Sequence, residues 1–203
     1  PKLVIKAFLA AEDKNFYSHP GIDFPGVARA ALTNIIQVGR NRRPVGASTI
    51  TQQVAKNFLL TNEVSIARKV KEAILAFRIE HAFSKDRILE LYLNEIYLGF
   101  GSYGVAAASL NYFNKSMDEL STEEVAYLAA LPKAPNNYHP IRNVRAALGR
   151  RNWVISRMEK EGFIPSIQAS RARKIPLVVR PRKDTLLVRA EYFSEEVRRE
   201  LME

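Results

Sequence analysis

Apolar residues recur three and four positions apart along most of this chain, which is the spacing of one face of an α-helix. Residues that cap helix N-termini stand at the start of several of these apolar runs: Thr49, Ser65, Ser84 and Ser121. Thr49 and Ser121 are each followed three positions later by Gln or Glu, which completes a capping box. This patterning constrains the fold more than any other feature of the sequence, and it predicts a mostly α protein.

The same signals give the predicted extent of each element. An apolar helix near the N-terminus runs into two adjacent carboxylates, Glu12 and Asp13. Residues 39–46 are basic and rich in Gly and Pro, which predicts a loop. Further helices are predicted over residues 26–38, 49–60, 65–83, 84–98, 121–131 and 143–162.

The pattern changes after Pro176. Short extended segments are predicted near the C-terminus at residues 177–179 and 186–188, and a helical segment at residues 191–201. We therefore expect one domain over residues 1–175 and a linker, or the start of a following domain, over residues 176–203. The chain begins at Pro1, inside an apolar stretch and without Met, so it reads as part of a longer protein.

The formal net charge of +10 is unevenly spread. Residues 1–80 hold 12 Lys and Arg against 6 Asp and Glu, residues 81–150 hold 7 against 7, and residues 151–203 hold 12 against 8. This distribution suits an anionic partner such as phosphate, lipid headgroups or nucleic acid. No apolar run approaches the ~18 residues that suggest a membrane span. Cys is absent, which excludes disulfides and thiolate chemistry.

Three clusters of residues could carry chemistry. In the first, Glu12 and Asp13 are followed by the aromatic Phe16 and by a His-Pro-Gly turn that begins at His19. A carboxylate at the end of an apolar helix can lie at the edge of a pocket, where partial desolvation raises its pKa and suits it to general-base catalysis. Taken alone, this pattern is more typical of a solvated or capping Glu.

The second cluster spans residues 46–57. A hydroxyl-rich helix N-terminus attracts anions through its unpaired N–H groups and the helix dipole. Gln53, Lys56 and Asn57 lie three or four positions apart and share one helix face. Such a face can hold phosphate and sugar hydroxyls together, although an ordinary capped helix has the same signature.

In the third cluster, Arg68 and Lys69 precede Glu72 by one helical turn. A basic pair beside a carboxylate forms either a structural ion pair or a mixed site for a diphosphate, with or without a metal ion. The residues leave both interpretations open.

Taken in order, these clusters resemble the motifs of the glycosyltransferase family 51 domain of class A penicillin-binding proteins, the peptidoglycan glycosyltransferases. The second motif matches nearly letter for letter, with Ala47 where the family often has Gly. The resemblance extends to about Gly162. The five stretches that carry it are residues 12–21, 46–57, 68–72, 87–94 and 124–132.

The resemblance implies a mostly α fold with a lysozyme-like large lobe and a smaller, membrane-contacting lobe. It implies that the substrate is lipid II, a disaccharide-peptide on undecaprenyl diphosphate. The growing glycan strand is the donor, and the 4-hydroxyl of the GlcNAc of lipid II is the acceptor. Inverting transfer then gives β-1,4 glycan strands for the bacterial cell wall.

The resemblance also assigns roles to residues. Glu12 is the general base, and Glu72 is a second catalytic carboxylate that either holds a divalent ion, as a metal ligand, or orients Arg68 and Lys69. Asp13, Phe16 and His19 shape the pocket of the base. Substrate binding is assigned to Ser48, Thr49, Gln53, Lys56, Asn57, Arg68, Lys69 and Lys133. No cofactor is required in this scheme, and a divalent cation (Mg or Mn) assists.

The expected partners are lipid II, the growing strand and an anionic membrane surface, with no nucleic acid. We expect the outer face of the bacterial cytoplasmic membrane as the location, with an anchoring span upstream of Pro1. The Ser-x-x-Lys acylation motif of a transpeptidase is absent. Either a C-terminal transpeptidase domain follows beyond Glu203 in the parent chain, or the parent protein is monofunctional. The change of pattern after Pro176 favours the first option.

Two alternatives remain at this stage. A lysozyme-like enzyme that cleaves the same glycan also needs a single Glu, but has little use for the cluster at Lys56, Arg68 and Lys69. A non-enzymatic basic module binding membrane or nucleic acid would spread its basic residues along a groove between exposed aromatic residues.

Overall fold

A computed structural model of the protein describes residues 1–37, 46–59 and 65–180, and these residues are mostly helical. The described residues contain no β-strand, only an isolated bridge between Tyr97 and Tyr103. The predicted mostly α class is therefore confirmed. The elements are α1 (Lys2–Glu12), the 3₁₀ turn η1 (Phe16–Ser18), α2 (Phe24–Ile36), α3 (Ile50–Leu59), α4 (Ile66–Ala82), α5 (Lys85–Glu95), α6 (Val105–Phe113), α7 (Thr122–Leu128), α8 (Val144–Lys160) and α9 (Ser166–Lys174).

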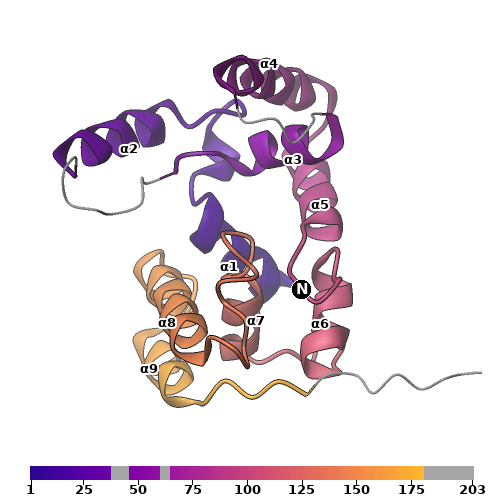
Figure 1. The fold of residues 1–203 in the computed structure, drawn as a ribbon, viewed down its shortest axis with the longest axis vertical. Coiled ribbons are helices and arrows are strands. Elements are labelled where there is room, and N and C mark those ends of the chain that lie inside the picture. Colours follow the sequence, from indigo (N-terminus) through magenta and orange to yellow (C-terminus); the bar gives the residue numbers. More distant parts are fainter. Residues whose placement is uncertain (38–45, 60–64, 181–203) are drawn as a thin grey trace, which may run out of the picture.

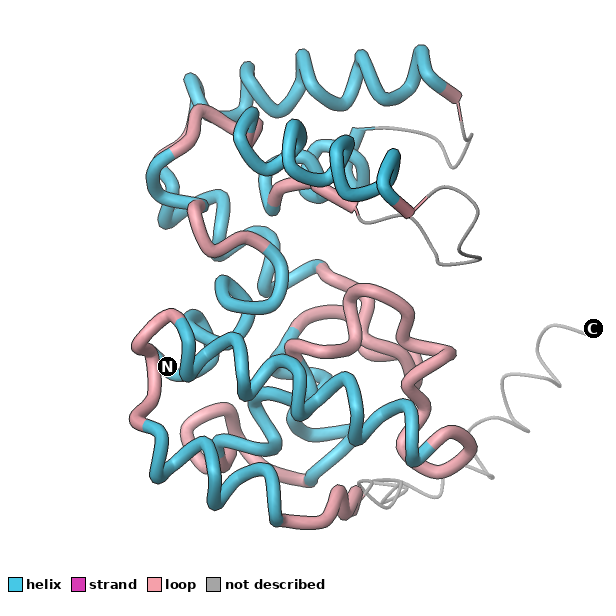
Figure 2. Tube along the Cα trace, turned by 90° about the vertical axis from the view of Figure 1, so that its left-hand side faces the viewer, coloured by secondary structure: helices cyan, strands magenta, loops and turns pink. Residues whose placement is uncertain are grey.

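The helices form two groups, one above the other (Figure 1). Helices α2, α3 and α4 make the upper lobe, and α1, α6, α7, α8 and α9 make the larger lower lobe. Helix α5 runs between them at one side and packs against α3 of the upper lobe. The view from the side keeps the same division (Figure 2).

The core of the large lobe is built around α1 and α7, two apolar helices that pack against each other and against α8. Residues 125–131 are all at most 1% exposed, and three of them are Ala. Small side chains let the helix backbones approach closely, while Phe8 of α1 and Tyr127 of α7 fill the remaining space at 0% exposure. This packing fixes α1 along its length.

The predicted N-terminal caps are present. The hydroxyl oxygen of Ser65 accepts a hydrogen bond from the Arg68 amide at 3.1 Å, and Ser84 caps α5 in the same way. The Thr49 amide donates to Oε1 of Gln52 at 2.9 Å and the Gln52 amide donates to Oγ1 of Thr49 at 3.2 Å, which confirms that capping box. Ser121 forms the other one.

Two helices, α6 and α9, were not predicted. Their N-caps are Gly104 and Pro165, neither of which makes a side-chain cap hydrogen bond, so the usual start signal is missing. The predicted helix over 84–98 was too long, because α5 ends at Glu95 and the chain then turns. In that turn Gly104 has a φ of 78°, and a Cβ there would lie 2.3 Å from the carbonyl oxygen of Asn94. Only glycine fits this position.

The apolar side chains of α4 form a stripe along one side of the helix, but this stripe faces outward. Ile66, Val70, Ile74 and Phe77 are between 48% and 86% exposed. The residues that α4 buries are Glu72 and Ala76. An apolar stripe normally faces a core, so α4 is inverted with respect to that rule.

Helix α2 also exposes large apolar side chains: Phe24, Val27, Leu32, Ile35 and Ile36. In the described part of the chain, no helix combines the length and the apolar character needed to cross a bilayer.

Near the C-terminus, residues 176–180 form neither helix nor strand, and the Arg180 amide donates to the Tyr112 carbonyl at 2.8 Å. The extended segment predicted at 186–188 and the helix at 191–201 lie outside the described residues. So does nearly all of the loop predicted at 39–46.

Arg151 ties α9 to the large lobe. Its side chain is 0% exposed, and its guanidinium donates to the carbonyl oxygens of Ile175 at 2.8 Å and Arg173 at 3.3 Å. These carbonyls lie at the C-terminal end of α9, where backbone acceptors lack helical partners and a cation is favourable.

We expect Arg151→Met to lower the free energy of unfolding by about 1–3 kcal/mol, because it removes the buried donor that binds the Arg173 and Ile175 carbonyl groups. Urea denaturation of the protein measures this. The matched control is Arg171→Met, on the exposed side of α9. Equal stability of the two variants would contradict the capping role.

Candidate active site

Glu12 is the last residue of α1 and lies where the two lobes meet. Its side chain is half-buried, and its Oε2 accepts a hydrogen bond from Nε2 of Gln53 on α3 at 2.9 Å. Burial raises the pKa of the Glu12 carboxyl, and this effect is larger than the opposing effect of the Gln53 hydrogen bond. A carboxyl with a raised pKa in a cavity has the properties of a general base.

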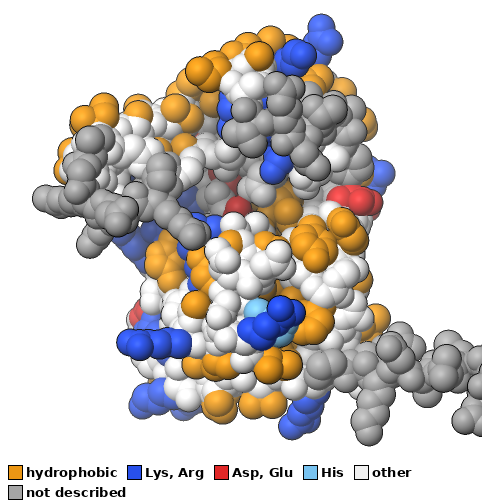
Figure 3. Space-filling view, in the orientation of Figure 1, with side chains coloured by type: hydrophobic (Ala, Val, Ile, Leu, Met, Phe, Trp, Pro, Cys, Tyr) orange, Lys and Arg blue, Asp and Glu red, His pale blue; other side chains and the backbone are white. Residues whose placement is uncertain are grey.

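Two adjoining cavities meet at Glu12, and acidic atoms are visible in the hollow between the lobes (Figure 3). The larger cavity has a volume of about 520 Å³ and the smaller one about 240 Å³. Glu12 and Trp153 line both of them. The larger cavity also has a strongly basic lining: Lys56, Arg68, Lys69, Lys133 and Arg150.

The wall of the larger cavity carries a buried carboxylate between two cations. Glu72 is 1% exposed, with Nζ of Lys69 at 2.5 Å from Oε1 and Nη1 of Arg68 at 3.5 Å from Oε2. Nζ of Lys69 also donates to the hydroxyl of Ser48 at 2.9 Å. Glu72 therefore fixes both cations at the cavity wall, since both of its oxygens are engaged.

Nε of Arg68 is buried and has no hydrogen-bond partner among the described residues. Such an atom has lost its water without gaining an acceptor. Arg68 as a residue lines the larger cavity, where an anionic ligand can accept hydrogen bonds from its guanidinium.

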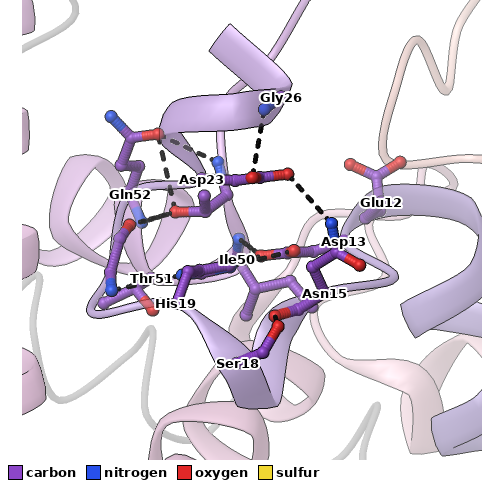
Figure 4. Close-up of polar contacts among 12 residues, drawn as sticks. Glu12, Asp13, Asn15, Ser18, His19, Asp23, Gly26, Ile50, Thr51 and Gln52 are labelled. Atoms are coloured by element: carbon purple, nitrogen blue, oxygen red, sulfur yellow. Dashed lines mark hydrogen bonds and ion pairs between the residues drawn. The ribbon is translucent and has the colours of Figure 1, made fainter.

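Asp13 and His19 form the buried support beneath Glu12 (Figure 4). Nε2 of His19 lies 3.0 Å from both carboxylate oxygens of Asp13, and the Gly21 amide donates to Nδ1 at 3.2 Å. Because Nδ1 accepts, the ring hydrogen is on Nε2, which donates to Asp13. The Asp13 carboxylate also accepts from the Ile50 amide at 3.0 Å, so it fixes the start of α3.

The turn after His19 needs Gly21. Its φ is +90°, and a Cβ would lie 3.1 Å from the carbonyl oxygen of Ala76 on α4. Phe16 is 0% exposed, packs edge-to-face against the His19 ring, and lies under the ammonium group of Lys85 at 4.4 Å. Asp13, Phe16 and His19 are thus buried in contact with each other. Asp13 also lines the smaller cavity, and the role of these residues in shaping the pocket stays a prediction.

The structure brings most of the predicted binding residues together. Ser48, Gln53, Lys56, Arg68, Lys69 and Lys133 all line the larger cavity. Thr49 lines the smaller one, but it is 2% exposed and its hydroxyl donates to the Gly21 carbonyl at 2.6 Å. Asn57 is exposed and lines neither cavity. The binding roles of these residues stay predictions.

Sequence reasoning missed Arg150, Trp153 and Arg157 of α8. Arg150 lines the larger cavity, Arg157 lines the smaller one, and Trp153 lines both. The signal was available in their spacing of three and four positions, which places them on one helix face around the only Trp of the chain.

The described residues contain no group of three or more His, Cys, Asp or Glu that could hold a metal ion. Glu72 is the predicted metal ligand, and its oxygens already contact Lys69 and Arg68. A lone carboxylate with two cationic partners does not fit a divalent ion held by the protein alone, since such ions prefer several oxygen ligands.

The chain belongs to the transglycosylase family, whose sequence model matches residues 1–159. This confirms the resemblance of its motifs to those of the peptidoglycan glycosyltransferases. Penicillin-binding protein 1A of Rickettsia felis is 53% identical over 202 residues, which is 100% of this chain and 26% of that protein. Penicillin-binding protein 1A of Escherichia coli is 45% identical over 201 residues, covering 99% of this chain and 23% of that protein.

A crystal structure of penicillin-binding protein 1A from Haemophilus influenzae matches with 38% sequence identity and a TM-score of 0.49, covering 78% of this chain and 21% of that one. The chain therefore spans about a quarter of the length of the relatives that it matches.

Proposed function

We propose that this chain polymerises lipid II by transferring the growing glycan strand from undecaprenyl diphosphate to the 4-hydroxyl of an incoming GlcNAc. The observation that carries the proposal is the position of Glu12 at the boundary of two cavities, one of which has a basic lining. A transferase needs room for two substrates on either side of its base. The diphosphate end of the donor fits the basic cavity, and the acceptor sugar fits the other.

Glu12 acts as the general base in this proposal. Inverting transfer requires a base that takes the proton of the attacking hydroxyl on the face opposite the leaving group. The hydrogen bond from Gln53 occupies one carboxylate oxygen of Glu12, Oε2. The other oxygen, Oε1, is the one that we assign to the acceptor hydroxyl.

The diphosphate leaving group needs charge stabilisation more than a proton. Lys56, Arg68 and Lys69 line one cavity and can oppose its charge directly. We assign to Glu72 the orientation of Arg68 and Lys69, because it contacts both. A divalent cation (Mg or Mn) is then an assistant and no cofactor is required.

A lysozyme-like cleaving enzyme remains the alternative. Its leaving group is a sugar that must be protonated, so it would gain nothing from three or more cations in the same cavity as its catalytic Glu. A transferase requires a lipid diphosphate donor and a cleaving enzyme does not, so an assay of this requirement distinguishes the two functions. For binding to nucleic acid, the basic residues would have to follow an open groove, whereas here five of them line one cavity together with Glu12.

We also propose that the upper lobe contacts an anionic membrane, which supplies lipid II. The exposed apolar side chains of α2 and α4 gather on this lobe, and the predicted basic loop with Arg40, Arg42 and Arg43 follows α2 in the sequence. The corresponding location is the outer face of the bacterial cytoplasmic membrane. We expect an anchoring span upstream of Pro1 and a C-terminal transpeptidase domain in the parent chain.

The first test of this function replaces the base. Glu12→Gln keeps the size of the side chain but removes its basicity, so lipid II polymerisation should fall by about 10²–10⁴-fold. Binding of lipid II and the folded state, measured by circular dichroism, should persist. The matched control is Glu90→Gln, an exposed carboxylate on α5. A Glu12→Gln variant with near-normal turnover would exclude this role.

The second test separates cationic stabilisation from metal dependence. Arg68→Ala should lower polymerisation by about 10²-fold or more, whereas treatment with a chelator should leave partial activity. Arg87→Ala, in an exposed ion pair on α5, is the matched control. Complete loss in chelator, restored by Mg²⁺ or Mn²⁺, would show that a metal is required.

The third test concerns the membrane. The protein should bind anionic vesicles in a salt-sensitive way, and the combined change Val70→Ser and Ile74→Ser on α4 should weaken this binding. Ile167→Ser removes an even more exposed apolar side chain from α9, in the lower lobe, and should not weaken binding. Equal binding to neutral vesicles, or equal effects of both changes, would argue against an upper-lobe membrane surface.

A further inference from the structure

One face of α8 presents an aromatic ring between two guanidinium groups. The guanidinium carbon of Arg150 lies 3.9 Å from the centre of the Trp153 ring, and that of Arg157 lies 5.9 Å from it. A planar cation stacked on an indole ring is favourable and restricts the motion of the cation. Arg150 is therefore held at a defined place in the wall of the larger cavity, which it shares with Glu12.

The charges of the two arginines are used differently. Nη2 of Arg157 donates to Oε1 of Glu161 at 3.1 Å, so its charge is paired. Arg150 has no carboxylate within ion-pair distance among the described residues, and its buried Nε has no hydrogen-bond partner there. The unpaired charge of Arg150 acts on its surroundings, and Glu12 is the carboxylate that it stabilises.

Glu12 is surrounded by groups from several elements. Burial raises its pKa most, and the charge of neighbouring Asp13 raises it further. Gln53 of α3, Arg150 of α8 and Lys133 from the loop after α7 lower it. The other charged groups that line this cavity are Lys56, Arg68, Lys69 and Glu72, and those that line the smaller cavity are Lys14, Asp23, Arg29 and Arg157. The charge of Glu12 in turn raises the pKa of the buried Tyr92 of α5.

A partly buried base has to meet two opposing requirements. Burial increases its basicity, but a carboxyl that is protonated before the substrate arrives cannot accept a proton. A fixed cation near the carboxylate resolves the conflict because it favours the ionised form. Arginine suits this position since its guanidinium stays protonated when partly buried.

We propose that Arg150, held against Trp153, is a positioning residue that keeps Glu12 ionised until the acceptor hydroxyl enters. This inference rests on the proposed function, in which Glu12 is the base. It assigns to α8 a part in the chemistry that is separate from binding the diphosphate.

The direction of the effect follows from charge. Polymerisation should fall on the acidic side as Glu12 becomes protonated. Removing the positive charge of Arg150 destabilises the Glu12 carboxylate, so the pKa of Glu12 rises and the acidic limb moves to higher pH. Loss of activity should consequently be greater in acid than on the plateau.

The experiment measures kcat and KM for lipid II from about pH 5.5 to about pH 9, with the protein that contains this chain. Arg150→Gln should shift the acidic limb of kcat to higher pH. The ratio of its kcat to that of the wild type should therefore be severalfold lower at the acidic end than on the plateau. Arg150→Lys retains the charge, so its acidic limb should lie closer to that of the wild type than the limb of Arg150→Gln does. Arg145→Gln removes an exposed charge from the same helix and should change neither.

A uniform loss at every pH, or a raised KM with an unchanged limb, would overturn the proposal and indicate a structural or diphosphate-binding role. If Arg150→Gln does not fold, Trp153→Leu tests the same point, because loss of the stack frees Arg150 and should shift the limb in the same direction. An unshifted limb in Trp153→Leu would also overturn it. Failure of the wild-type protein to make polymer would instead reject the proposed function.

Discussion

The burial of α1 is the constraint on which the site depends. Its apolar side chains lie in the centre of the large lobe, so the helix cannot move without disrupting the core. The packing of this helix consequently fixes the position of its last residue, Glu12, in the cleft. Asp13, the next residue, is held by His19 and by the first amide of α3. The core of the large lobe thus fixes the position of Glu12, and the first turn of α3 in the upper lobe fixes its neighbour Asp13.

The same arrangement places a charged group where it is partly shielded from water, which is unfavourable. A carboxylate in a cavity between two lobes is desolvated, and the positive groups around it must offset that cost. On the α4 side, the charges of Arg68 and Lys69 are partly balanced by Glu72, so these cations are held but not fully neutralised. On the α8 side, Arg150 stacks on Trp153 without a carboxylate partner. This distribution of charge supports the proposal that the cavity takes an anionic group while Glu12 stays ionised.

The parts of the fold that could be predicted are those set by local interactions. The starts of α4, α5 and α7 depend on hydrogen bonds between a side chain and a backbone amide three residues away, and sequence shows these directly. Helices α6 and α9 have no such cap and begin where tertiary packing allows. The site follows the same rule: spacing along one helix predicted the proximity of Arg68 and Glu72. The approach of Arg150 to Glu12 depends on how α8 packs against α1, which no local pattern contains.

Helix α4 shows how one periodic sequence can serve two surfaces. The period of 3.6 residues that places Ile66, Val70 and Ile74 in one exposed row also places Arg68 and Glu72 at the cavity. A helix with this pattern normally packs its apolar stripe against the core of its protein. The opposite orientation of α4 is maintained by its ion pairs on the cavity side and by its packing against α3. In the proposed lipid-linked substrate, the polyprenyl chain and the diphosphate are joined. A helix with an apolar outer face and a cationic inner face matches both parts of such a molecule at the point where they meet.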